Sequence, residues 1–248
     1  MLPGFAYLKS LWMSLGFLSL FSVSQTPITY GPSLMEMSPT TYIIDVDLHG
    51  VVFNTDIAGI LRYHNNLKNR WTAYGLFGKM LINGDINKLR STTKVAEHGF
   101  DILIKKYPEL NNFRKDFITL ANLQKPNIEV VALLKGLKAQ GYTLVLASNI
   151  GKESYEDLCK KFPDIMGLFD LNFLVDPVAQ MYGKPAPEYF VGLKKFIADN
   201  GHAGKNIVLI DDSEKNVKEA AHHTISGILF KNAAELEKLL KSKKALAS

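Results

Sequence analysis

Short apolar runs alternate with longer amphipathic stretches along most of the chain. The runs are rich in large, often β-branched residues and predict buried strands at 42–46, 142–147, 171–175, 206–210 and 226–230. Apolar residues three and four positions apart predict helices at 130–140, 152–162, 187–200, 214–222 and 233–240. Strands that alternate with helices indicate an α/β fold, in which helices cover both faces of a parallel sheet.

The stretch between the first two predicted strands differs from the rest. From residue 55 to residue 125 the pattern is helical, interrupted by Gly75, Gly78, Gly84 and Gly99, and Pro126 ends it. We therefore predict a core of residues 41–56 and 127–248, with a helical insertion of residues 57–126.

The N-terminus has a pattern of its own. Residues 11–23 (LWMSLGFLSLFSV) carry no charge over 13 positions, which is short for a bilayer span of about 20 residues. Ser22 and Ser24 stand where a signal peptidase requires small residues, so residues 1–24 are interpreted as a secretory signal peptide and Gln25 as the new N-terminus. Cleavage implies a periplasmic or secreted protein without a stable membrane span, and otherwise the protein is cytoplasmic. The alternatives are an uncleaved membrane anchor and a true start at Met13, Met35 or Met37. Residues 25–40 are rich in Pro, Ser and Thr and predict a linker.

Composition narrows the class of protein. The 248 residues are 47% hydrophobic and 21% charged, which is typical of a globular protein with one large or two small domains. No internal repeat is present. The single cysteine, Cys159, excludes an intramolecular disulfide and a cysteine-rich zinc site, and we expect it to pack in the core.

The net charge of +5 is concentrated in the predicted insertion. Residues 57–125 hold 12 Lys and Arg against 5 Asp and Glu, but these cations are spread out and form no dense run. A solvated helical surface is therefore favoured over a nucleic-acid patch, and we expect no nucleic-acid partner. A small anionic substrate is compatible with this charge.

Polar residues stand where several predicted strands end. They are Asp45, Asp47 and His49 at the first strand, Ser148 and Asn149 at the second, Lys184 before the helix at 187, and Asp211, Asp212 and Asn216 at the strand 206–210. Each alone could be a helix cap or a solvated loop residue. Together, in a parallel sheet, they indicate a site at the carboxyl ends of the strands.

These residue types allow one particular chemistry. Carboxylates brought together repel one another, and oxygen ligands of this kind suit Mg²⁺. A carboxylate beside such a cation can attack a phosphoryl group and form an aspartyl-phosphate. A serine hydroxyl can hold phosphoryl oxygens, and a lysine can balance their charge.

Four segments resemble the motifs of the haloacid dehalogenase-like superfamily of hydrolases, most closely its branch with a helical cap after the first strand. They are DLHGVVFNT at 47–55, LVLASNIG at 144–151, GKPAP at 183–187 and VLIDDSEKN at 208–216. The resemblance covers about residues 42–240. It implies a Rossmann-like core and a cap, here residues 57–126, that closes over the substrate and sets its specificity.

The resemblance also implies roles for the site residues. Asp47 would be the nucleophile and a Mg²⁺ ligand, with the His49 backbone carbonyl, Asp211 and Asp212 completing the ligand set. Ser148 and Asn149 would bind the transferring group. Lys184 would pair with that group and with Asp47, and Asn216 would support the metal site from outside the ligand set.

One position departs from the family pattern. Phosphatases of the family usually have Asp two residues after the nucleophile, as the general acid, and this chain has His49. Taking Asp45 and Asp47 as the Asp-x-Asp pair instead would put Leu48 where glycine is expected, whereas the Asp47 register places Gly50 at the tight turn. Asp45 then points to the same side of the strand as Asp47, and no role is predicted for it.

Three functions follow from this departure. A phosphatase could use His49 or water as its acid, although a neighbouring cation and Lys184 would disfavour the imidazolium. A catalytically impaired binding protein is the second, and a dehalogenase-type hydrolase the third. The pair Asp211–Asp212 favours a metal-dependent phosphohydrolase, because dehalogenases of the family lack it. His64 and His98 are expected at the surface or in packing, and His222 and His223 at a helix C-terminus. The substrate and the oligomeric state are left open.

Overall fold

A computed structural model describes residues 27–66, 75–76, 79–80, 82–84, 96–175 and 183–246. The predicted signal peptide, Gln25 and much of the predicted cap lie outside these residues. Among the helices of the described part, none has the length and apolar character that crossing a bilayer requires.

The main sheet has six strands in the order β1-β8-β7-β2-β5-β6. All neighbouring pairs are parallel except β1 and β8, which are antiparallel. The strands are β1 (Thr29–Tyr30), β2 (Tyr42–Val46), β5 (Thr143–Ser148), β6 (Leu171–Leu174), β7 (Asn206–Asp211) and β8 (Ser226–Leu229). The central strand β2 is buried at every position, which its apolar sequence explains. The carboxyl ends of β2, β5 and β7 therefore meet at one edge of the sheet.

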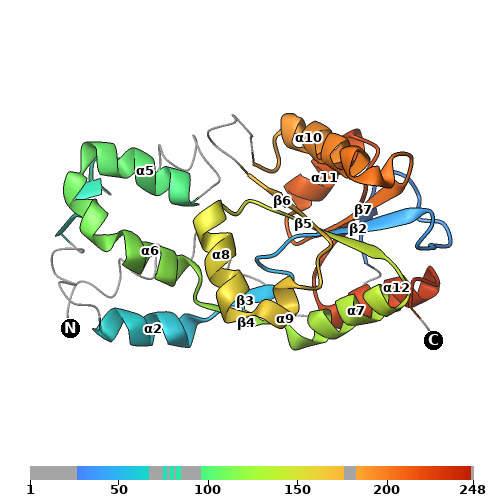
Figure 1. Ribbon diagram of the computed structural model, residues 1–248, viewed down its shortest axis with the longest axis horizontal. Helices are drawn as coiled ribbons and strands as arrows, with labels where there is room; N and C mark the ends of the chain where they lie inside the picture. The colour runs from blue at the N-terminus through green and yellow to red at the C-terminus, as the bar shows by residue number, and fades with distance from the viewer. Residues whose placement is uncertain are drawn as a thin grey trace.

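Helices cover both faces of the sheet, as Figure 1 shows, with α10 and α11 on one side and α7 and α12 on the other. Their bounds are α7 (Ile128–Ala139), α8 (Lys152–Lys161), α9 (Pro163–Met166), α10 (Pro187–Ile197), η2 (Ala198–His202), α11 (Glu214–His222) and α12 (Ala233–Ser242). The predicted α/β fold with helices on both faces is confirmed.

Alternate residues of the strands pack into two separate apolar cores, one on each face of the sheet. Ile44 and Val46 of β2 pack with α7, α8 and α12, whereas Ile43 packs with α10 and α11. The period of two along a strand produces this division. Asparagine side chains start two of the covering helices, because Asn127 accepts from the Val130 N–H and Asn232 from the Glu235 N–H.

The helical insertion leaves and re-enters the core through a short antiparallel ribbon. It pairs β3 (Phe53–Thr55) with β4 (Gln124–Pro126), and Asn54 lies opposite Lys125. The described helices of the insertion are α2 (Ile57–Asn66), α5 (Ala96–Lys106), η1 (Pro108–Phe113) and α6 (Arg114–Ala121). They lie at one end of the molecule, beyond α8, at the left of Figure 1.

Two parts of the sequence-based prediction differ from the structure. The predicted linker contains the edge strand β1, and its Leu34 and Met37 are buried against the core. The segment predicted as helical from residue 55 to 125 begins and ends in the strands β3 and β4. These three strands are two or three residues long and pair with segments far away in the chain, so a local pattern does not reveal them.

Candidate active site

The parallel sheet brings the predicted site residues to one edge. Asp47 follows the last residue of β2, Ser148 is the last residue of β5, and Asp211 is the last residue of β7. Val46 is in register with Leu146 on one side and with Ile210 on the other. Ser148 and Asp211 therefore flank the turn that carries Asp47.

Three carboxylates gather at this edge. Asp47, Asp211 and Asp212 each offer an oxygen, and these oxygens all lie within 4.8 Å of one another. Asp47 and Asp211 are buried, whereas Asp212 is exposed. The trio can thus be reached from solvent on the Asp212 side.

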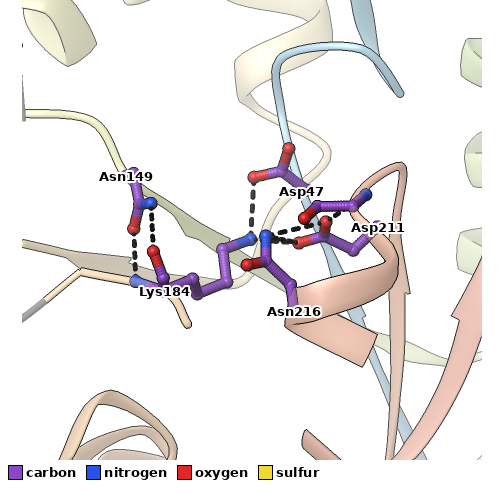
Figure 2. Close-up of polar contacts among 6 residues, drawn as sticks. Asp47, Asn149, Lys184, Asp211 and Asn216 are labelled. Atoms are coloured by element: carbon purple, nitrogen blue, oxygen red, sulfur yellow. Dashed lines mark hydrogen bonds and ion pairs between the residues drawn. The ribbon is translucent and has the colours of Figure 1, made fainter. Parts of the chain in front are cut away.

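Lys184 lies against two members of the trio, Asp47 and Asp211, as Figure 2 shows. Its Nζ donates to Asp47 Oδ1 at 2.8 Å and to Asp211 Oδ2 at 2.6 Å, and its side chain is 1% exposed. Lys184 lies in the loop before α10, and this loop places its ammonium at the carboxyl ends of β2 and β7.

Two asparagines hold this arrangement in place. The side chain of Asn149 donates to the Lys184 carbonyl at 2.9 Å and accepts from the Lys184 N–H at 2.7 Å. Asn216 donates to both oxygens of Asp211, at 2.9 and 3.1 Å (Figure 2). Asn216 therefore stands behind the carboxylates, where it was predicted. The observed contacts of Asn149 orient the Lys184 backbone, and its role toward the transferring group stays a prediction.

Gly50 makes the turn after β2 possible. Its φ is +85°, and a Cβ at this position would lie 2.1 Å from Asp212 Oδ2. Any side chain here would displace the carboxylate. The tight turn required by the Asp47 register is thus present, whereas Asp45 lies inside β2 and outside the trio.

The carboxylates and the lysine alter one another's protonation. Loss of hydration of its carboxyl group, and then the charges of Asp47 and Asp211, raise the pKa of Asp212 to about 6. Burial also raises the pKa of Asp211, although Lys184 acts in the opposite direction. Burial alone would lower the pKa of Lys184, but Asp47 and Asp211 raise it well above its usual value. The raised pKa favours the ammonium form of Lys184, and the raised pKa values of Asp211 and Asp212 mean that a proton and a divalent cation compete for these carboxylates.

His49 follows Asp47 by two residues, in the same turn. Burial lowers the pKa of its imidazole; Asp47 partly offsets this, and Lys184 adds to the lowering. The neutral imidazole is therefore favoured near pH 7, which agrees with the expected effect of Lys184.

A hollow of about 520 Å³ adjoins the site without containing it. Its lining includes Gly50, Asn54, Glu129, Phe230 and Lys231. It reaches the turn after β2 through Gly50.

The other residues singled out from the sequence lie elsewhere. His222 and His223 are at the C-terminus of α11, where each contacts Glu219. Cys159 is partly buried and packs against the core. The side chains of His64 and His98 lie outside the described part of the chain. Sequence reasoning overlooked the buried Tyr189, because nothing in a helical pattern separates its hydroxyl from an ordinary core aromatic.

The residues at this edge suit a hard divalent cation. Asp47, Asp211 and Asp212 bring three negative charges when ionised, and Lys184 balances one of them. Carboxylate oxygens this close are the ligand type that Mg²⁺ binds. The donor set therefore fits the metal that the sequence predicted.

Solved structures with the same fold were found by comparison. The HAD family enzyme bt-2542 from Bacteroides thetaiotaomicron aligns with a TM-score of 0.59 and 20% identity, over 81% of this chain and 98% of that one. A structure of the wild-type bt-2542 protein in complex with magnesium and inorganic phosphate aligns with a TM-score of 0.54 and 21% identity, over 77% and 95%. The L-2-haloacid dehalogenase RSc1362 aligns with a TM-score of 0.52 and 18% identity, over 77% and 86%. At these identities the likeness establishes the fold.

Membership of a family follows from the sequence match. No curated protein matches the chain. The family model for haloacid dehalogenase-like hydrolases matches residues 44–224, from within β2 to the residues just after α11. This range includes the strand ends, the insertion and every residue of the carboxylate site. The chain therefore belongs to the haloacid dehalogenase-like hydrolases.

Proposed function

We propose that this hydrolase is a Mg²⁺-dependent phosphatase of the helical-cap branch, which acts on a small phosphate ester. The observation that carries the proposal is the trio Asp47, Asp211 and Asp212 with Lys184 between two of its members. The positive charge of Lys184 attracts the anionic phosphoryl group. It thereby holds this group beside the Asp47 carboxylate, which is the nucleophile.

The reaction has two displacements at phosphorus. An oxygen of Asp47 attacks the phosphorus, the P–O bond of the ester breaks, and the leaving alkoxide takes a proton from His49 or from water. Water then attacks the phosphorus of the aspartyl-phosphate and gives a proton to the base left by the first step, which is neutral His49 or hydroxide. The P–O bond to Asp47 breaks, which releases inorganic phosphate and restores the Asp47 carboxylate. Ser148 holds a phosphoryl oxygen through its hydroxyl, and Lys184 offsets the charge that develops on the transferring group.

Asp47, Asp211, Asp212 and the His49 backbone carbonyl would hold Mg²⁺. When bound, Mg²⁺ supplies Lewis-acid stabilisation of the phosphoryl oxygens. Asn216 orients Asp211 through two hydrogen bonds and so supports this ligand set. The structure of bt-2542 with magnesium and inorganic phosphate, which has the same fold, supports the proposal.

A catalytically impaired binding protein is the second candidate, and His49 favours it. The lowered pKa of this imidazole leaves little acid form at neutral pH. A dehalogenase-type hydrolase is the third, since a solved L-2-haloacid dehalogenase shares the fold. The closely spaced carboxylates argue against it, because a halide leaving group needs neither a proton nor a metal.

The test is phosphate release from a panel of alkyl and aryl phosphates, with Mg²⁺ and with EDTA. The phosphatase should require Mg²⁺, and Asp47→Asn should lower turnover by roughly a thousandfold or more. The matched control is Asp199→Asn, because Asp199 is an exposed carboxyl paired with Lys195. Activity that survives Asp47→Asn removes Asp47 from its role. Halide release from a 2-haloacid without metal would establish the dehalogenase.

The partners and the location are part of the same proposal. The substrate is a small phosphorylated anion, and no nucleic acid is involved. We propose that residues 1–24 direct export, which gives a periplasmic or secreted enzyme. N-terminal sequencing of protein from its native host should then begin near Gln25. A chain recovered from soluble cytosol that still begins at Met1 would refute export.

A further inference from the structure

One edge of the main sheet is covered by residues 27–33, the covering segment. Its strand β1, Thr29 and Tyr30, pairs with β8, and the Leu229 N–H donates to the Ile28 carbonyl at 2.9 Å. Without this segment, the four residues of β8 would form the edge of the sheet, with unpaired N–H and C=O groups. Such an edge is a template for pairing with another chain.

The covering segment itself is a poor template for strand pairing. Pro27 and Pro32 flank β1, and neither has an N–H group to donate. Gly31 follows β1 with a φ of +81°, which takes the chain out of the extended conformation. Among the described residues, no strand pairs with the other side of β1. The segment therefore replaces a four-residue edge by a two-residue edge that ends in a turn.

The chain crosses the edge of the sheet from one apolar core to the other. Tyr30 packs against the core under α10 and α11, and its hydroxyl donates to Glu214 of α11 at 2.7 Å. The Ser226 hydroxyl of β8 donates to the Pro32 carbonyl at 2.9 Å. Leu34, directly after the covering segment, is buried in the core on the other face. The segment is thus fastened to β8 and α11 on one side and ends at a buried anchor.

Most of the covering segment lies in solvent. Five of its seven residues are exposed, and only Pro27 and Tyr30 are partly buried. A segment with few buried apolar contacts opens locally at a low cost in free energy. Leu34 and Met37, at 4% and 3% exposed, hold the following residues in the core when the covering segment leaves β8.

We propose that the covering segment is a displaceable cover, which prevents β8 from pairing with β8 of a second copy of this chain. A two-fold axis makes two copies of one strand antiparallel, and that is the orientation β1 has against β8. Ile228 packs in one core and Leu229 against the other, so a strand paired with β8 extends both cores. The proposal concerns assembly and is independent of the proposed phosphatase activity.

The test adds a side chain to Gly31 in the full-length protein. A Cβ at this position lies 2.8 Å from the Ile225 carbonyl oxygen, so Gly31→Val should release residues 27–33 from β8. In dilute protein, the Leu229 amide should then exchange its hydrogen about tenfold faster or more. At rising concentration, sedimentation should show a species of twice the wild-type mass. The matched control is Gly204→Val, because Gly204 has the same φ of +81° but open space around its Cβ.

A second variant and a peptide make the test specific for the β8 edge. Tyr30→Pro removes a backbone N–H of β1 without adding a side chain against Ile225, and it should give the same two results. A peptide of residues 27–34 (PITYGPSL), added in excess to Gly31→Val, should protect the Leu229 amide again and restore the wild-type mass. The same peptide with proline in place of its tyrosine should do neither.

Three results would overturn the proposal. A fast-exchanging Leu229 amide in a protein that keeps the wild-type mass at high concentration would show that the open β8 edge does not pair. A doubled mass that the peptide leaves unchanged would place the new interface elsewhere. Continued protection of the Leu229 amide in both Gly31→Val and Tyr30→Pro would show that the cover is not displaceable.

Discussion

His49 is the residue that most affects the chemistry of the site. The imidazolium form of His49 is the one that can protonate a leaving alkoxide, and burial lowers the pKa of this side chain, so little of that form is present near pH 7. We predict that His49→Asp raises kcat for alkyl phosphates, where general acid catalysis contributes about 10²–10⁴-fold. Aryl phosphates have better leaving groups and should change less. The ratio of kcat values for the two ester classes measures the effect.

The reverse outcome would identify His49 as a working acid. If His49→Asp lowers kcat, or only shifts its pH profile, the imidazole itself supplies the proton. Rapid hydrolysis of alkyl phosphates by the wild type, lost in His49→Ala, would lead to the same conclusion. A wild type without turnover that still binds Mg²⁺ would favour the binding protein.

Substitution of Gly50 can separate the effect of its contact with Asp212 from the effect of backbone strain. In Gly50→Ala, the new Cβ meets Asp212 Oδ2 and the residue keeps a positive φ, so both stability and Mg²⁺ affinity should fall. Gly201→Ala is the matched control, because Gly201 has a φ of +86° but open space around its Cβ. The control should lose about 1–2 kcal/mol of unfolding free energy from backbone strain, with unchanged Mg²⁺ affinity by calorimetry. Equal behaviour of the two variants would contradict the contact with Asp212.

At the scale of elements, α8 joins the insertion to the core. Asn122, which is buried at the end of the insertion, donates to the Ser154 carbonyl at 3.2 Å and to Asp157 at 3.0 Å. Arg114 at the start of α6 forms ion pairs with Asp101 of α5 and Glu153 of α8. Because α8 follows the loop after Ser148, the insertion is anchored next to the proposed phosphate site.

The Asn122 hydrogen bonds and the Arg114–Glu153 ion pair should contribute differently to the free energy of unfolding. Asn122→Ala removes both hydrogen bonds of a buried side chain and should cost about 1–3 kcal/mol in urea unfolding. Glu153→Gln breaks an exposed ion pair and should cost about 1 kcal/mol or less, an effect that salt further reduces. A larger loss in Glu153→Gln than in Asn122→Ala would show that the ion pair is the main anchor.

At the scale of the whole molecule, pH and metal should act on the same carboxylates. Asp212 has its pKa raised to about 6, so without metal it holds its proton more tightly in the folded than in the unfolded protein. Its contribution to stability is therefore greatest below about pH 4 and is lost as the pH rises through 6. Mg²⁺ competes with that proton, so stabilisation by the metal should grow over the same range.

The measurement is the urea midpoint with Mg²⁺ and with EDTA, at about pH 5 and about pH 7.5. We expect a larger difference between Mg²⁺ and EDTA at the higher pH. Asp212→Asn should reduce the difference at both values. Equal differences at the two pH values in the wild type would contradict competition between proton and metal.

Much of the fold was predictable from local patterns. The runs at 42–46 and 206–210 are apolar enough to be buried on both faces, and they became the adjacent strands β2 and β7. Helix 214–222 has the bounds that its sequence predicted. The short strands β1, β3 and β4 were missed, because their partners stand far away in the chain and their own residues carry no period.

The candidate site, like the fold, was predictable from the sequence only in part. Residue types and their order at strand ends were enough to select Asp47, Lys184, Asp211 and Asp212, since parallel strands bring their carboxyl ends together. Only the tertiary structure showed that the Asn149 side chain holds the Lys184 backbone. A one-dimensional pattern specifies which face of a strand a side chain occupies. It does not specify which group from another element lies opposite, because that depends on how helix and sheet pack in three dimensions.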